Sequence, residues 1–138
     1  MSTILVIDDS LSALQMAGMI LESAGYQVST CANGRRAVQM LRQETFDLIL
    51  TDIYMPDADG LEVIREAHQI CPGVPVVAMS GATGLRNMLA IAKYLGASQI
   101  VHKPFSKSDL LNAVATALDA RCGGGPPARP ARGTEIER

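Results

Sequence analysis

The residue that first suggests chemistry in this sequence is Asp52. It follows the apolar stretch Leu48–Thr51 and precedes a turn that starts at Pro56 and contains two further acids. The apolar stretch is typical of a buried strand, and the proline and glycine of the turn are typical of a surface loop. A carboxylate at such a strand end is costly to bury unless it is paired or binds a metal. We therefore expect other residues of the chain to meet Asp52.

Four polar residues stand in equivalent places elsewhere in the sequence. Asp8 and Asp9 follow a first apolar run, Ser80 follows a later one, and Lys103 comes after the last. In a parallel sheet the residues that follow the strands lie along one edge, and ligands bind there where the strand order reverses. Such a sheet would bring two carboxylates, a hydroxyl and an ammonium group to Asp52.

The elements that must position these residues alternate between strands and helices. Strands are expected at five segments, which are Thr3–Ile7, Gln27–Cys31, Phe46–Thr51, Pro75–Met79 and Gln99–Val101. Amphipathic helices are expected after each of them, starting near Leu11, Gly34, Gly60, Leu85 and Ser106, the last with a capping-box pattern. This alternation predicts an α/β domain. We expect a doubly wound five-stranded parallel sheet of flavodoxin-like order 2-1-3-4-5 with helices on both faces.

The expected strand order places the first and third strands side by side, so Asp8, Asp9 and Asp52 should lie close together. Like charges at close range either shift a pKa or recruit a cation, and an oxygen-only ligand set favours Mg²⁺. A metal, the Lys103 ammonium and the Ser80 hydroxyl around one carboxylate could stabilise the oxygens of a transferring phosphoryl group. The pattern therefore predicts Asp52 as a nucleophile that forms an aspartyl phosphate, with Mg²⁺ as cofactor.

Length and composition exclude several other classes of protein. A chain of 138 residues fits one domain over residues 1–120, followed by a Gly/Pro/Arg-rich tail over residues 121–138 that we expect to be disordered. The net charge of -2 leaves no basic footprint for nucleic acid. No signal peptide or run of ~20 apolar residues is present, so we expect no membrane insertion and a cytoplasmic location. The three cysteines, Cys31, Cys71 and Cys122, fit neither a disulfide framework nor a zinc site.

Four pieces of the sequence together resemble the receiver domain of two-component response regulators. They are Asp8-Asp9, the run from Asp52 to Gly60, Ser80-Gly81 and Lys103-Pro104-Phe105, and the resemblance covers about residues 3–120. It implies a stand-alone signalling switch in which Asp52 accepts a phosphoryl group. The donor would be the phosphohistidine of a sensor histidine kinase or a histidine phosphotransfer protein. The output would be the binding of an unidentified downstream protein by the last strand and the last two helices.

The resemblance also assigns roles to the other site residues. Mg²⁺ would be bound by Asp9, Asp52 and the backbone carbonyl of Tyr54, while Asp8 would act mainly through water. Ser80 would be the switch hydroxyl that moves onto the phosphoryl group. Lys103 would form a salt bridge with that group, and the peptide bond from Lys103 to Pro104 would be cis.

Three features depart from the usual pattern of this family. Ile100 stands three residues before Lys103, where an aromatic residue is usual, so any signal must pass through backbone and apolar repacking. Asp57 stands where glycine is frequent and adds a charge near the site. Tyr54 and Ala82 occupy places that bear on dephosphorylation in the family, and no phosphoryl lifetime follows from them.

Two alternatives from other classes remain open. A phosphohydrolase that works through an aspartyl phosphate usually carries a second aspartate two residues after the nucleophile, where this chain has Tyr54. We therefore expect no enzyme beyond a chain that assists its own phosphorylation and dephosphorylation. A flavin-binding domain of the same topology would need a Ser/Thr-rich phosphate loop after the first strand, but Asp8 and Asp9 would repel the phosphate there.

Overall fold

The computed structural model describes residues 2–53, 60–80 and 96–120, except for the side chains of Leu61 and Ser80. The strands are β1 (Thr3–Ile7), β2 (Gln27–Cys31), β3 (Leu48–Asp52), β4 (Val76–Ser80) and β5 (Gln99–His102). The helices are α1 (Leu11–Ser23), α2 (Gly34–Gln43), α3 (Gly60–Ile70) and α5 (Lys107–Asp119).

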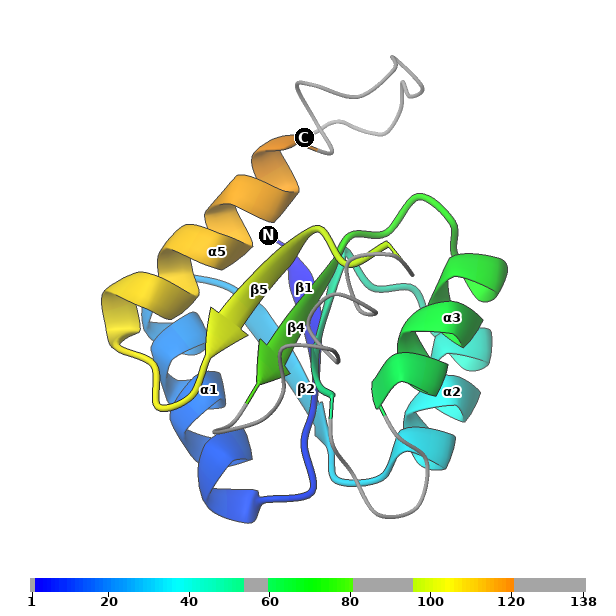
Figure 1. Cartoon of the computed structure of the whole chain (residues 1–138), viewed down its shortest axis with the longest axis horizontal. Helices are drawn as coiled ribbons and strands as arrows, with labels where there is room; N and C mark the ends of the chain where they lie inside the picture. The colour runs from blue at the N-terminus through cyan, green and yellow to red at the C-terminus, as the bar shows by residue number, and fades with distance from the viewer. Residues whose placement is uncertain (1, 54–59, 81–95, 121–138) are drawn as a thin grey trace.

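The strands form one parallel sheet in the order β2-β1-β3-β4-β5. Helices α1 and α5 cover one face of the sheet, and α2 and α3 cover the other (Figure 1). The predicted fold class and strand order are therefore confirmed. The predicted fourth helix, Leu85–Leu95, and the predicted tail over residues 121–138 lie outside the described residues.

The carboxyl ends of three strands lie one residue further along the chain than predicted. Strand β3 includes Asp52, which pairs with Met79 of β4. Strands β4 and β5 extend to Ser80 and His102, and these two residues pair with each other. The hydrogen-bonded ladder thus continues past the last apolar residue of each run. At its other end β3 starts at Leu48 rather than at Phe46.

The sheet is apolar on both faces because helices cover both. On the α2/α3 face, Leu5 of β1 and Ile49 of β3 pack with Ile64 of α3. On the α1/α5 face, Leu50 of β3 packs in a second cluster with Leu110 of α5, and both are fully buried. Full burial of such side chains contributes about 1.5–3 kcal/mol each. The central strands are therefore held firmly at the edge where the candidate site residues lie.

Side-chain caps form at the starts of α1 and α5. The Ser10 hydroxyl accepts a hydrogen bond from the Ala13 amide at 3.3 Å at the start of α1. At the start of α5 the Asp109 amide donates to the Ser106 hydroxyl at 3.0 Å, and the Ser106 amide donates to the Asp109 carboxylate at 3.3 Å. The predicted capping box is confirmed. Within the described ranges, no helix is long and apolar enough to cross a membrane.

Candidate functional site

Three carboxylates converge at the carboxyl edge of the sheet. Strands β1 and β3 are neighbours, with Ile7 paired to Thr51, so Asp8 follows β1 beside the place where Asp52 ends β3. One carboxylate oxygen from each of Asp8, Asp9 and Asp52 lies within 4.8 Å of the others. The prediction that these three carboxylates meet is confirmed.

The three carboxylates differ in their exposure to solvent. Asp8 is fully buried, Asp52 is 6% exposed, and Asp9 is exposed. One oxygen of Asp8 accepts a hydrogen bond from the Ser10 amide at 2.9 Å, which orients the carboxylate. A buried carboxylate also needs a cation to offset the cost of desolvation. Lys103 provides this cation.

Lys103 supplies positive charge to both buried carboxylates. Its Nζ atom lies 2.5 Å from Asp8 Oδ2 and 3.6 Å from Asp52 Oδ2. Its side chain is 23% exposed, so the ammonium lies at the boundary between the cluster and solvent. The peptide bond from Lys103 to Pro104 is cis, as predicted. The closer partner of the lysine is Asp8, a pairing that the sequence analysis did not anticipate.

The donor set suits a hard divalent cation. Three carboxylates supply oxygen atoms only, and the chemistry of Mg²⁺ favours one or two carboxylates together with water and phosphate oxygens. Exposed Asp9 gives solvent access to the cluster. The residues therefore fit Mg²⁺, with Asp9 and Asp52 as the candidate ligands, because Lys103 contacts Asp8 more closely than Asp52.

Two predicted site residues are described only in part or not at all. Ser80 ends β4 and pairs with His102, so its backbone lies on the same edge as Asp52. Its side chain, the predicted switch hydroxyl, is outside the described part of the structure. Tyr54, whose backbone carbonyl is a predicted metal ligand, lies outside the described residues, as do Asp57 and Ala82.

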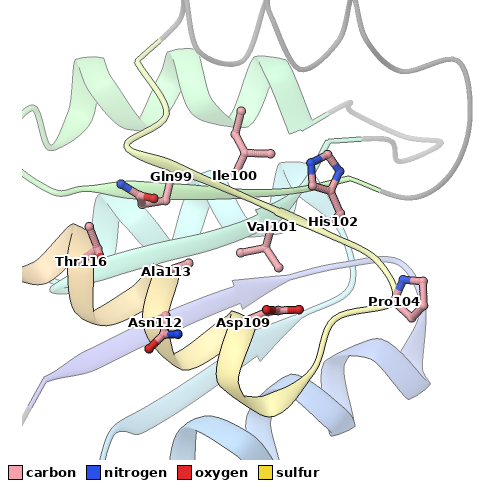
Figure 2. Close-up of a pocket in the computed structure, with 9 residues that line it drawn as sticks. All are labelled: Gln99, Ile100, Val101, His102, Pro104, Asp109, Asn112, Ala113 and Thr116. Carbon is pink, nitrogen blue, oxygen red and sulfur yellow. The ribbon is translucent and has the colours of Figure 1, made fainter.

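A polar groove runs between β5, the strand that Lys103 follows, and α5. It has a volume of about 410 Å³, and its lining includes Ile100 and His102 of β5 and Asp109 of α5 (Figure 2). Ile100 is partly buried and also packs against the core cluster on the α2/α3 face. The side chain that replaces the expected aromatic therefore packs against the core, and its strand forms one wall of the groove.

A second hollow lies directly beside the carboxylate cluster. It has a volume of about 430 Å³ and lies between α1 and the chain segment that precedes α5. Its lining includes Ser12 and Met16 of α1 and Lys103 and Phe105 of the segment. The sequence analysis did not identify this hollow. The order of apolar and polar residues does not show that α1 and Phe105 lie side by side.

The histidines and cysteines play no part in the described site. His68 of α3 contacts the backbone oxygen of Gly96 through Nε2 at 3.2 Å, and His102 lies at the groove described above. Cys31 is buried and Cys71 is half-buried, and both are free thiols. Burial raises the pKa of the Cys71 thiol. The third cysteine, Cys122, lies outside the described residues.

Comparison with known proteins gives one consistent family. The sequence model for the response regulator receiver domain matches residues 4–115. The response regulator receiver protein CpdR of Brucella abortus (strain 2308) is 32% identical over 120 residues, which cover 87% of this chain and 99% of that protein. Transcriptional regulatory protein GlrR of Escherichia coli (strain K12) is 30% identical over 116 residues, 84% of this chain. This chain spans only about a quarter (26%) of the length of GlrR.

Solved structures lead to the same family. A CheY-like response regulator receiver domain protein from Methanospirillum hungatei JF-1 superposes with a TM-score of 0.84 at 31% identity, covering 91% of this chain and 99% of that chain. The chemotaxis protein CheY4 of Vibrio cholerae gives a TM-score of 0.78 at 29% identity, with coverage of 85% and 98%. The fold therefore agrees with what these comparisons find.

Proposed function

This chain belongs to the response regulator receiver domain family, and from that premise we propose that Asp52 is its phosphoacceptor. Receiver domains are signalling switches of two-component systems rather than classical enzymes. The observation that carries the proposal is the position of Asp52 at the end of a central strand, within 4.8 Å of two further carboxylates and 3.6 Å from a lysine. The receiver domain would comprise residues 1–120, with residues 121–138 as a tail.

In the proposed reaction a carboxylate oxygen of Asp52 attacks the phosphorus atom of a phosphohistidine. The P–O bond forms as the P–N bond of the donor breaks, and the donor imidazole leaves and takes up a proton from solvent. The donor would be a sensor histidine kinase or a histidine phosphotransfer protein. The chain's own residues position the nucleophile and stabilise charge, which is the main requirement of phosphoryl transfer.

Lys103 and Asp8 would act as a unit. The Lys103 ammonium lies close enough to Asp52 to contact an oxygen of the phosphoryl group once it is transferred. Asp8 holds the ammonium in this position through its direct contact with Nζ and is itself oriented by the Ser10 amide. Asp8 would thus serve as a positioning residue for Lys103, in addition to its predicted contact with Mg²⁺ through water.

Mg²⁺ would be held by Asp9, Asp52 and the backbone carbonyl of Tyr54. When bound, it neutralises the negative charge that would otherwise repel an incoming phosphoryl group. The need for such neutralisation follows from the three clustered carboxylates, which outnumber the single lysine charge that contacts them among the described residues. Ser80, at the end of β4, would be the switch hydroxyl that moves toward the phosphoryl group.

The output would be altered binding of a downstream protein by β5, α5 and the predicted helix Leu85–Leu95, which lies outside the described residues. Ile100 supports this proposal because its side chain packs against the core on the α2/α3 face, while the strand that carries it forms one wall of the β5/α5 groove (Figure 2). Repacking around Ile100 would change the shape of the groove without rotation of an aromatic ring. We expect the protein to act in the cytoplasm, without binding nucleic acid and without inserting into a membrane.

The experiment that tests the phosphoacceptor is incubation of the full chain with acetyl phosphate and Mg²⁺, followed by intact-mass measurement. We expect one phosphoryl group on the wild-type chain and none on Asp52→Asn. Glu44→Gln, which removes an exposed carboxylate from the end of α2, is the matched control and should be labelled like the wild type. Equal labelling of Asp52→Asn and wild type would contradict the proposal. Sustained release of phosphate from a small phosphomonoester would favour the phosphohydrolase alternative instead.

A further inference from the structure

The outward face of α1 is unusually apolar for a helix that faces solvent. Among the described residues, the exposed large hydrophobic side chains are Leu11, Met16 and Met19, with 69%, 50% and 70% of their surface exposed, and all three lie on α1. Gln15, also exposed, lies between them. The sequence has no charged residue from Leu11 to Leu21. Clustered exposed apolar side chains of this kind mark an interaction surface.

These side chains form a stripe that is complementary to itself. Leu11, Gln15 and Met19 are spaced by four residues and so lie in one row along the helix, and Met16 lies beside the middle of that row. When two copies of α1 pack antiparallel around a two-fold axis near Gln15, Leu11 of each copy meets Met19 of the other. An isologous dimer requires such a self-complementary patch.

The distribution of charge also suits a second copy of the chain. Along the sequence the charged residues nearest to the stripe are Asp9, just before α1, and Glu22, in its last turn. Lys103 lines the same hollow as Met16, so these three charges would lie at the rim of the contact. An apolar centre with a polar rim is the usual composition of a protein interface. The stripe offers on the order of 400 Å² per copy, about half of the ~800 Å² per partner in a standard interface. We therefore expect weak association, with a Kd on the order of 100 µM.

The same face borders the candidate site. Met16 and Ser12 of α1 line the hollow of about 430 Å³ that also contains Lys103 and Phe105. Lys103 in turn contacts the carboxylates of Asp8 and Asp52. A copy of the chain seated on α1 would therefore cover this hollow and the side of the Asp52 site that it borders.

We propose that this chain forms a weak two-fold dimer through the Leu11–Met19 stripe of α1 and that the dimer restricts access to the Asp52 site. The dimer itself follows from the surface of α1, whereas the restriction of access rests on the proposed phosphoacceptor function. Methionine side chains suit a reversible contact because they are flexible and adapt to the surface opposite them.

The first test is sedimentation equilibrium of the full chain across a concentration series that extends above the expected Kd. The weight-average mass should rise from 14.6 kDa toward twice that value for the wild type and should stay at the monomer value for Met19→Lys. Gln39→Lys, which adds the same charge to an exposed position of α2, is the matched control and should dimerise like the wild type. Because the contact is apolar, added salt should not weaken it. A wild type that remains monomeric throughout the series would overturn the proposal and leave α1 to a different partner.

The second test examines the geometry of the dimer. Gln15→Cys should form a disulfide-linked dimer under mild oxidation, because the two-fold axis brings this position close to its symmetry mate. The variant is made in a Cys122→Ser background, and Gln39→Cys in the same background should not cross-link. Dimerisation without cross-linking at position 15 would show that another face is used and would overturn the proposal.

The third test separates the dimer from the phosphoacceptor function. With acetyl phosphate and Mg²⁺, the rate of phosphorylation per chain should fall several-fold as the wild-type concentration passes the Kd, and Met19→Lys should show no such fall. Absence of phosphorylation in every variant would contradict the phosphoacceptor proposal and leave the sedimentation result standing. A rate that is independent of concentration for a wild type shown to dimerise would overturn the restriction of access.

Discussion

Replacement of the proposed phosphoacceptor by its neutral isostere should make the metal-free protein more stable. In Asp52→Asn the shape of the side chain is kept while one of the three clustered negative charges is removed. Lys103 keeps its direct contact with Asp8 in this variant. We therefore expect the relief of repulsion to outweigh the loss of attraction between Lys103 and Asp52.

The magnitude can be estimated from the distances in the site. At an effective dielectric constant of about 20, two like charges at 4.8 Å, the upper limit of the separations in this cluster, repel by about 3.5 kcal/mol, and Asp52 faces two such partners. The Lys103 ammonium at 3.6 Å attracts Asp52 by about 4.6 kcal/mol on the same scale. The balance is about 2 kcal/mol of repulsion. Because solvent screens exposed Asp9, we expect Asp52→Asn to raise the free energy of unfolding by about 1 kcal/mol.

The assay is urea unfolding of wild type and Asp52→Asn in EDTA and in Mg²⁺. A ligand that binds only the folded state at ten times its Kd stabilises that state by about 1.4 kcal/mol. Mg²⁺ should stabilise the wild type by an amount of this order and the variant by less, so the advantage of the variant should shrink or reverse. Glu44→Gln, which lies outside the cluster, should change stability by less than about 0.5 kcal/mol in both buffers.

Two outcomes would refute the electrostatic reasoning. A lower free energy of unfolding for Asp52→Asn than for wild type in EDTA would mean that the attraction of Lys103 exceeds the repulsion from Asp8 and Asp9. Equal stabilisation of both proteins by Mg²⁺ would mean that Asp52 is not a metal ligand. A double-mutant cycle with Lys103→Met would then measure the coupling between the lysine and Asp52 directly.

Two further predictions concern regions away from the site. Gly96→Ala should destabilise the protein more than Gly25→Ala. Both glycines have positive φ, +107° and +96°, but of the two only the new Cβ at Gly96 would clash with His68 Nε2. Backbone strain alone predicts that Gly25→Ala lowers the free energy of unfolding by about 1–2 kcal/mol, as measured by urea unfolding. Adding His68→Ala should recover part of the extra loss of stability caused by Gly96→Ala. Equal losses of stability at the two glycines would contradict the clash with His68. The pKa of Tyr26 is raised from its ordinary value of 10.0 by burial and then by the charge of Asp119. The folded state therefore retains this proton longer than the unfolded state, so stability should decline as the pH rises above about 10. Tyr26→Phe should show a shallower decline, and the same slope in both proteins would argue against the raised pKa.

The alternation of strands and helices could be predicted from the sequence because it depends on neighbouring residues. Periodicity, turn residues and caps act over a few positions, and Ser106 with Asp109 formed the predicted capping box. The placement of Asp52 and Lys103 on one edge also followed, because parallel strands all end on the same side. The ends of strands were predicted less well, since pairing in the ladder carried β3 on to Asp52 and β4 on to Ser80.

Only the tertiary structure decided how the charges are paired and which of them are buried. Asp8 and Asp9 are adjacent in the sequence and chemically identical, yet Asp8 is fully buried while Asp9 is exposed. Lys103 lies 95 residues from Asp8 and contacts it more closely than it contacts Asp52. The sequence by itself thus determined the kinds of residue at the site and the edge of the sheet that carries them. Their pairing depended on contacts between distant segments, whose energies arise only when the strands are assembled.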